Sequence, residues 1–240
     1  MRVLVIRAEP AASRTAARLT AAGHEPVVLP LVHIAPMDAR IINHRDFDAV
    51  AVTSANAARL SSRAMLTDIG HLPCFAVGDE TANVAREAGF TDVTSAQGDA
   101  CALAALITRS MPSRSRILYL CGKLRRDTFE RLLRDDGFDV TPIEVYDTVE
   151  VTYGLDELAA RLGGEPIDGI LVHSLETARS LMQLLEKDGS TLMSQDTPLI
   201  CISSRVGALF GKNFAETHVA REPTEASMLS TLRDISSAEP

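Results

Sequence analysis

The stretch AVAVTSANAAR at residues 49–59 recurs in outline as GILVHSLETAR at residues 169–179. In both, a short apolar run ends at a serine, and a stretch containing Ala-Arg follows. An apolar run of four residues followed by a helical pattern predicts a strand that leads directly into a helix. Repetition of this unit along a chain predicts parallel sheets covered by helices.

The same rhythm extends over most of the chain. The predicted strands and helices pair as 3–6 with 11–22, 49–52 with 54–66, 75–77 with 79–88, 117–120 with 125–135, 169–172 with 174–186, 199–202 with 204–210, and 218–220 with 225–235. Corresponding segments of the two halves keep a nearly constant offset, which predicts two related α/β domains.

Two segments break the rhythm, at residues 26–37 and 140–152. Each is long for a strand, rich in β-branched residues and interrupted by proline. Long strands at matching places in two repeats are able to run from one domain into the other. A simple tandem division near residue 112 is the alternative, and the sequence pattern leaves both open.

Composition excludes several classes of function. The 240 residues carry a net charge of −8, include no tryptophan and are 4% aromatic, which argues against a nucleic-acid partner. No window approaches the roughly 18 apolar residues of a membrane span, and residues 1–7 read as a first strand, not as an export signal. The four cysteines form no CxxC pair and the six histidines show no zinc-ligand spacing, so we expect no metal and a reducing cytoplasm.

Polar groups gather where the predicted strands end. Ligands of open parallel sheets bind beyond the carboxyl ends of the strands, where hydroxyls and free backbone N–H groups accept anions. The candidate binding residues at these ends are Arg7, Thr53, Ser54, Asn56, Gly78, Thr81, Gly122, Lys123, Ser174, Ser203, Ser204 and Arg205. The alternative is that the serines and threonines only cap helices. Their presence at several strand ends of two domains favours a shared anion-binding cleft.

Familiar catalytic motifs are missing. The chain has no GxxxxGK[ST] phosphate loop, no GxGxxG after its first strand and no GxSxG elbow. A basic cluster, KLRR at residues 123–126, opens a predicted helix, where positive charge is unfavourable unless it meets an anion. Its alternative is a solvated surface. Tyr146 lies in the second long segment, either as a strand aromatic packed at a junction between domains or as a phenol that acts as hydrogen-bond donor or general acid.

Taken in order, these motifs resemble the uroporphyrinogen-III synthase family over nearly the whole chain. Each motif is short, and their order and spacing carry the resemblance. They are RAEP at 7–10, GHE at 23–25 leading to Pro30, TSANA at 53–57, AVG at 76–78, CGKLRR at 121–126, VYDT at 145–148, DGI at 168–170 and PT at 223–224.

The resemblance implies an α/β fold of two flavodoxin-like, doubly wound parallel-sheet domains joined by a two-stranded antiparallel connection. Residues 1–36 and 150–240 would form one discontinuous domain and residues 39–148 the other, with linker strands near 33–38 and 144–150. This arrangement replaces the tandem division.

The resemblance also implies a function. The family's enzymes are lyases that cyclise hydroxymethylbilane, with loss of water and inversion of ring D, to uroporphyrinogen III in haem biosynthesis. They use no cofactor and no metal. By this likeness Tyr146 assists departure of the hydroxyl group, and Ser54, Thr81, Ser174 and Lys123 match positions that line the substrate pocket. We expect a cytoplasmic monomer whose partner is this small-molecule substrate.

One departure from the family pattern concerns the loop after the penultimate strand. The family often has Gly-Pro-Thr-Thr-Ala there, whereas this chain has SSRVG at residues 203–207. Arg205 is then either a surface residue or an extra contact to a substrate carboxylate. Two other functions compete with the synthase: a two-lobed binding protein for an anionic small molecule, and a paralogue of the synthase that has lost its activity.

Overall fold

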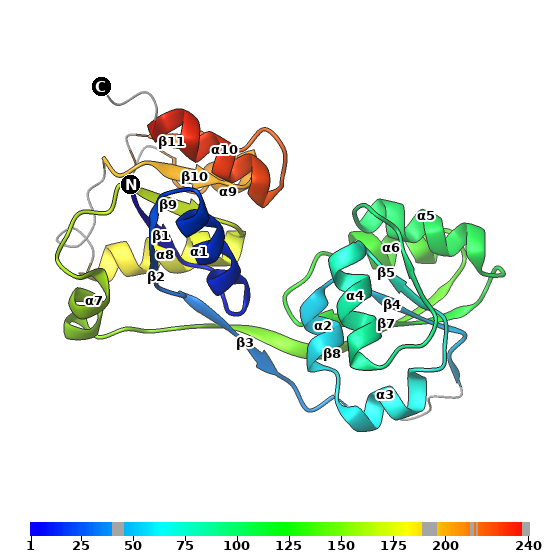
Figure 1. Cartoon of the computed structure of the whole chain (residues 1–240). Helices are drawn as coiled ribbons and strands as arrows, with labels where there is room; N and C mark the ends of the chain where they lie inside the picture. Colours follow the sequence, from blue (N-terminus) through cyan, green and yellow to red (C-terminus); the bar gives the residue numbers. More distant parts are fainter. Residues whose placement is uncertain (40–45, 189–195, 212–213, 215, 237–240) are drawn as a thin grey trace. The chain divides into compact units, whose positions relative to one another are not determined.

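The computed structural model describes residues 1–39, 46–188, 196–211, 214 and 216–236 (Figure 1). The chain divides into two compact units, one made of Met1–His33 with Val149–Pro240 and one of Ile34–Thr148. The first unit is therefore discontinuous in sequence. The chain passes between the units twice, after His33 and after Thr148.

The first unit is built on a five-stranded sheet in the order β11-β10-β9-β1-β2. Every pair in it is parallel. Numbered along the chain, this order is 2-1-3-4-5, the order of flavodoxin. The strands are β1 (Arg2–Val5), β2 (Glu25–Val28), β9 (Gly169–Val172), β10 (Leu199–Cys201) and β11 (Thr217–Val219).

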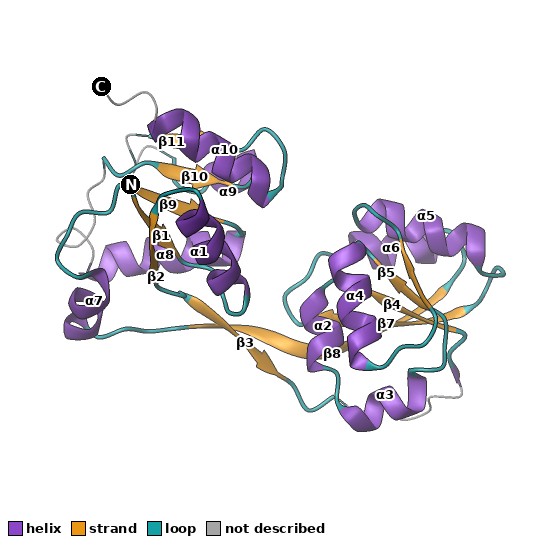
Figure 2. Cartoon of the chain, viewed as in Figure 1, coloured by secondary structure: helices purple, strands orange, loops and turns teal. Residues whose placement is uncertain are grey.

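Helices cover both faces of this sheet (Figure 2). Leu4 of β1 packs into a cluster with Leu158 and Leu181, whereas its neighbour Val5 packs into a cluster with Leu19 and Leu232. The alternation follows from the two-residue period of a strand. The helices are α1 (Ala11–Ala21), α7 (Leu155–Leu162), α8 (Leu175–Asp188), α9 (Ser204–Gly207) and α10 (Glu225–Ser236).

The second unit has a six-stranded sheet in the order β3-β8-β7-β4-β5-β6. Its strands are β3 (Val32–Pro36), β4 (Ala49–Val52), β5 (Cys74–Ala76), β6 (Val93–Ser95), β7 (Arg116–Gly122) and β8 (Asp139–Glu150). Its helices are α2 (Ala55–Leu60), α3 (Arg63–Ile69), α4 (Asp79–Ala88), α5 (Ala100–Ser110) and α6 (Thr128–Asp135). One core cluster joins α2, α3 and α4 to the sheet, and a second joins α5 and α6 to its other face.

The two sheets repeat one arrangement. Val3 of β1 lies opposite Gly169 of β9, and Ile117 of β7 lies opposite Ala49 of β4 in the same register. β2 and β8 flank these pairs in the same way on the other side. The spatial order is therefore shared, but the five equivalent strands of the second unit, β8-β7-β4-β5-β6, have the order 5-4-1-2-3 when they are numbered along the chain. The repeat seen in the sequence is thus a structural repeat, and the two units differ in the strand at which the chain begins.

The two long segments behave differently from one another. The first, expected over 26–37, divides into β2 and β3 on either side of Pro30, and the second forms the single strand β8. Proline carries no backbone N–H, so a sheet ladder is weakened where it falls.

β3 and β8 form the expected antiparallel connection. The amide of Met37 donates to the carbonyl of Val145, and the amide of Val151 donates to the carbonyl of Leu31, both at 2.9 Å. One residue number falls as its partner's rises, which is the pattern of an antiparallel ladder. The predicted fold class is confirmed.

The helix expected over 54–66 is two helices. The backbone of Ser61 is extended, and the hydroxyl of Ser62 accepts a hydrogen bond from the amide of Met65, which starts α3. Serine competes with helical backbone bonds in this way, so the pair Ser61-Ser62 ends one helix and caps the next. Within the described residues, no helix has the length and apolar character needed to cross a membrane.

Candidate functional site

A pocket of about 450 Å³ lies at the carboxyl ends of β4 and β7 in the second unit. These strands are neighbours, but the helices that follow them, α2 and α6, pack on opposite faces of the sheet. A crevice opens where consecutive helices diverge in this way, and ligands of open α/β sheets bind there. Its walls come from the ends of β4 and β7, the start of α5, the loop and first turn of α6, and β8. The lining residues are Thr53, Ser54, Asp99, Ala100, Cys101, Tyr119, Gly122, Leu124, Arg125, Arg126, Thr128, Phe129 and Tyr146.

Tyr146 enters the pocket because β8 is irregular beside it. Cys121 pairs with Glu144, but the next residue, Gly122, pairs with Tyr146, so Val145 is an extra residue in the ladder. A bulge of this kind redirects a side chain. Val145 is buried in the core below, and Tyr146 lines the pocket.

The Tyr146 ring lies directly over the backbone of Gly122. A methyl group built on Gly122 would stand 2.6 Å from Cζ and 2.9 Å from the phenol oxygen of Tyr146. The backbone is fastened at the same place, because the amide of Lys123 donates to the carbonyl of Tyr146 at 2.9 Å. Glycine at 122 thus makes room for the phenol.

A second phenol forms the floor. The oxygens of Tyr119 and Thr53 lie 2.7 Å apart, and the Tyr119 ring meets the edge of Phe129 at a centroid distance of 4.8 Å. Burial raises the pKa of Tyr119 to about 12, and the Thr53 hydrogen bond opposes this only in part. Tyr119 is therefore a neutral phenol at physiological pH and serves as a fixed polar wall.

Two helix starts at the pocket are already capped. The Ser54 hydroxyl accepts from the amide of Asn56 at 3.2 Å. The Asp99 carboxylate accepts from the amides of Cys101 and Ala102, at 2.9 and 3.0 Å. Capping, the alternative considered for such residues, therefore accounts for Ser54, although it also lines the pocket.

The cations of the cluster 123–126 differ in their partners. Lys123 Nζ donates to Asp147 at 3.0 Å, and the Asp147 carboxylate raises the pKa of Lys123. Arg125 Nε donates to Glu130 at 2.7 Å and its Nη1 to Glu144 at 2.8 Å. Arg126 is exposed and has no hydrogen bond or ion pair with any residue in the described part of the chain.

The structure brings four of the predicted residues into this pocket: Thr53, Ser54, Gly122 and Tyr146. Four others belong to the same unit but do not line it: Asn56, Gly78, Thr81 and Lys123. The Asn56 side-chain oxygen accepts from Arg59 at 2.9 Å, and Thr81 is buried in α4. Gly78 precedes α4 and faces open space.

The five remaining predicted residues lie at strand ends of the first unit: Arg7, Ser174, Ser203, Ser204 and Arg205. Arg7 Nη1 donates to Thr15 at 3.3 Å and lies 3.8 Å from the Glu225 carboxylate. The Ser174 hydroxyl accepts from the amide of Thr177 at 3.1 Å and caps α8. Ser204 and Arg205 are exposed at the start of α9.

Sequence reasoning missed His173, which follows β9 directly. Both ring nitrogens are buried and have no hydrogen-bond partner among the described residues. Burial, with a smaller contribution from the Arg7 guanidinium, lowers the pKa of His173 from 6.5 to about 3, and the backbone of Leu171, which is near the ring but outside hydrogen-bond geometry, opposes this only in part, so the ring is neutral. The internal repeat could have pointed to His173. In register, His173 corresponds to Thr53, and Val5 corresponds to Tyr119, the hydrogen-bond partner of Thr53, so the first unit lacks an equivalent partner at that position.

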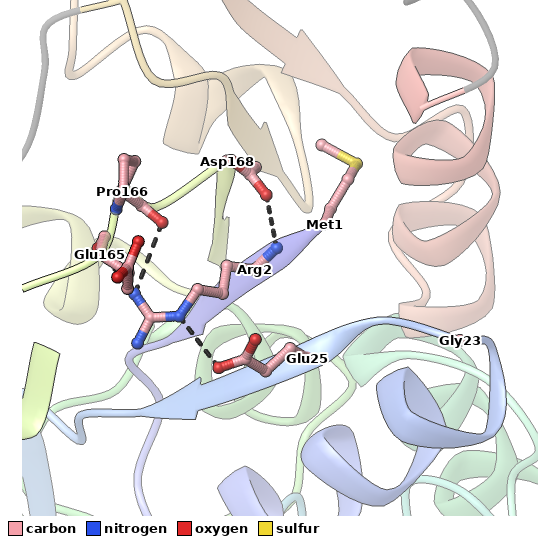
Figure 3. A pocket seen from close by; sticks show the side chains of 7 residues that line it. All are labelled: Met1, Arg2, Gly23, Glu25, Glu165, Pro166 and Asp168. Carbon is pink, nitrogen blue, oxygen red and sulfur yellow. Dashed lines mark hydrogen bonds and ion pairs between the residues drawn. The ribbon is translucent and has the colours of Figure 1, made fainter. Parts of the chain in front are cut away.

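A second pocket, of about 670 Å³, lies in the first unit at the amino ends of β1, β2 and β9 (Figure 3). Figure 3 shows Arg2 at its centre, with Nε donating to Glu25 at 2.9 Å and Nη1 directed at the carbonyl of Pro166 at 3.5 Å. Nη1 also donates to the carbonyl of Glu165 at 2.6 Å. The backbone amide of Arg2 donates to Asp168 at 2.6 Å. These bonds fasten strand ends to one another, and the pocket is at the end of the sheet opposite to that used by ligands of such folds.

The doubly wound units and the 450 Å³ pocket at the divergence of α2 and α6 define an α/β protein with a crevice where folds of this class bind small molecules. The pocket combines phenol and phenyl rings with a hydroxyl and a cation that has no ion pair among the described residues, which suits a ligand with a flat ring and an acidic group.

The comparisons identify the family. The family model described as "Uroporphyrinogen-III synthase HemD" matches residues 13–230, so the chain belongs to the uroporphyrinogen-III synthase family, whose enzymes act in haem biosynthesis on a small-molecule tetrapyrrole. The predicted family is confirmed. A comparison with curated proteins gives no match.

Two solved structures share the fold. Uroporphyrinogen-III synthetase from Helicobacter pylori 26695 is similar at 17% identity and a TM-score of 0.69, over 98% of this chain and 100% of that one. A mutant uroporphyrinogen III synthase from the extremely thermophilic bacterium Thermus thermophilus is similar at 16% identity and a TM-score of 0.52, over 100% of both chains. At these identities the likeness supports the fold.

Proposed function

We propose that the chain cyclises hydroxymethylbilane to uroporphyrinogen III, with loss of water and inversion of ring D, and is thus a lyase. The observation that carries the proposal is the placement of the Tyr146 phenol over Gly122 in the pocket at the sheet's divergence point, in a chain of this family. No metal or cofactor is required by this chemistry.

In the proposed reaction Tyr146 donates its proton to the departing hydroxyl group, which leaves as water. The electron pair of a pyrrole nitrogen replaces the broken C–O bond and gives an azafulvene cation. The substituted carbon of ring D then attacks this cation through a spiro intermediate. The bond from this carbon to the methylene bridge of ring C then breaks and leaves a second azafulvene cation on ring C. The other α-carbon of ring D attacks that cation, which closes the ring with ring D inverted, and this carbon releases a proton, which restores the phenol.

Positioning supplies most of the proposed catalysis. Loss of hydroxide from a pyrrolic carbon is easy, and closure without guidance gives the symmetric isomer, so the protein must hold the reacting ends. Groups fixed before binding suit this task. The Thr53–Tyr119 hydrogen bond and the backbone bond between Lys123 and Tyr146 hold the walls of the pocket in place.

We also propose that the residues predicted at the strand ends bind substrate, that the enzyme is a cytoplasmic monomer, and that nucleic acid is not a partner. The four free cysteines support the cytoplasm as its location, and the net charge of −8 argues against nucleic acid. The domains of the family are proposed to correspond to the two compact units.

The test is direct. Freshly made hydroxymethylbilane is added to the protein, the product is oxidised, and the isomers are separated. We expect the type III isomer in proportion to protein concentration. Formation of the type I isomer alone at every protein concentration would contradict the proposal and would leave a binding protein or an inactive paralogue.

A further inference from the structure

The loop from β7 to α6 presents cations to the pocket, but most of their charge is already neutralised. Arg125 is held by the carboxylates of Glu130 and Glu144, and its Nη1 also lies 3.3 Å from the carbonyl of Gly122. Lys123 is paired with Asp147 and does not line the pocket. A guanidinium with two carboxylates around it attracts a further anion weakly, so neither residue is a good receptor.

Arg126 is different. It lines the pocket, is exposed, and makes no ion pair within the part of the chain that the structure describes. A guanidinium forms paired hydrogen bonds with a carboxylate because its N–H groups match the two oxygens.

The pocket that Arg126 lines also has apolar surface. Leu124, another lining residue, is 55% exposed, and Phe129 and Tyr146 contribute aromatic rings to the lining. Such a wall favours a flat ring carrying an acid, because the ring covers the leucine while the acid reaches the guanidinium.

Another lining residue, Asp99, repels such an acid. Asp99 precedes α5, and its carboxylate takes the amides of Cys101 and Ala102 that would otherwise accept an anion. The start of α5 is therefore no receptor for a carboxylate, which leaves the Arg126 guanidinium.

We propose that Arg126 is the carboxylate receptor of this pocket and orients a pyrrole ring through its acetate or propionate group. The choice of a pyrrole rests on the proposed function, whereas the receptor role rests on the geometry. Arg126 thus determines which way round an acid-bearing pyrrole enters, and its neighbours Lys123 and Arg125 hold the loop.

The chain contains a reporter for the test. Cys101 lines the pocket and is exposed, whereas Cys74, Cys121 and Cys201 are buried. Alkylation of Cys101 by iodoacetamide therefore measures occupancy without turnover. The probes are a monopyrrole bearing one acetate and one propionate group and the dimethyl ester of the same compound.

In the wild-type protein we expect the acid to protect Cys101 at a concentration about ten- to a hundredfold lower than the ester, the range for one charge-assisted pair. Arg126→Gln should remove this difference, and Arg126→Lys should restore part of it. The control is Arg131→Gln, since Arg131 is exposed on α6, the helix that follows this loop, but does not line the pocket.

Equal protection by acid and ester in the wild type would overturn the receptor role, and so would an unchanged preference in Arg126→Gln. A wild type that neither compound protects would overturn it as well. The isomer assay tests the synthase activity separately. A protein that makes only the type I isomer but prefers the acid through Arg126 would refute the function and keep the receptor.

Discussion

The phenol ring of Tyr146 lies where a side chain at position 122 would be: a Cβ built on Gly122 would stand 2.6 Å from Cζ of Tyr146. The pairing arises from the irregular register of β7 and β8 at this point. The position of the phenol therefore depends on the absence of a side chain on the neighbouring strand, and not only on the tyrosine itself.

Gly122→Ala should displace the phenol from the pocket while the protein stays folded, because the new methyl group contacts the Tyr146 side chain, which is able to rotate, and not the backbone. We expect turnover of hydroxymethylbilane to fall about as far as it does in Tyr146→Phe. Gly154→Ala is the control, since a methyl group there meets nothing within 4 Å. Steady-state turnover and near-ultraviolet circular dichroism measure the two effects. Full activity in Gly122→Ala would show that the observed phenol position is not the working one.

Tyr146→Phe tests the phenol oxygen alone. A general acid contributes about 10²- to 10⁴-fold, and an easily broken C–O bond needs the lower end of that range. We expect single-turnover rates to fall by about a hundredfold at most, while a part of the product remains type III because positioning is kept. Tyr153→Phe is the matched control, since its hydroxyl donates to the Pro30 carbonyl in the other unit. An unchanged single-turnover rate in Tyr146→Phe would remove the acid role.

The alternation of apolar runs and helical stretches in the sequence predicts some of the residues that line this pocket but not others. Thr53, Ser54 and Gly122 are predictable because they directly follow apolar runs, and parallel strands bring such ends together. The residue pattern left Tyr146 with two readings, and the family resemblance gave it a role, whereas the bulge in β8 that brings it to the pocket has no periodic signal. The wall at Asp99 and Cys101 was missed because β6 is only three residues long and partly buried, so no apolar run marks it.

The sequence pattern does not predict which cations form ion pairs either. The cluster at residues 123–126 reads as three equivalent cations, and only the positions of Glu130, Glu144 and Asp147 show that two of them are neutralised. Glu144 and Asp147 are on the neighbouring strand β8 and Glu130 is on α6, so the packing of these elements sets the partners. The orphaned ring of His173 is of the same kind, because its lack of a partner among the described residues depends on which residue the adjacent strand places beside it.

His173 should make the protein sensitive to mild acid. The pKa of the folded-state ring is about 3 against 6.5 when unfolded, so between these values only the unfolded chain takes up the proton. This contribution to stability is complete above pH 6.5 and is lost as the pH falls. The loss approaches about 1.4 kcal/mol per pH unit, or about 2 kcal/mol between pH 7 and pH 5.

Urea unfolding at pH 7 and pH 5 measures this loss. His173→Thr, which copies the equivalent residue of the second unit, should reduce the difference between the two pH values by about 2 kcal/mol. His218→Gln is the control, since His218 is partly exposed beside Glu216. The same pH dependence in wild type and His173→Thr would mean that the ring is protonated in the folded protein.

Arg125 should matter for stability more than a surface arginine does. Its partner Glu130 has a side chain only 9% exposed, and Arg134 is the other cation near it, at 3.3 Å. Arg125→Met keeps the volume but leaves that buried carboxylate with one partner, which should cost about 2 kcal/mol of unfolding free energy. Glu157→Gln breaks an exposed pair with Arg161 on α7, leaves Arg161 over the Tyr153 ring, and should cost less than about 0.5 kcal/mol. Denaturant unfolding at neutral pH compares the two variants. Equal losses would show that Glu130 is satisfied by Arg134 alone, and the loop that carries Arg126 would then need another anchor.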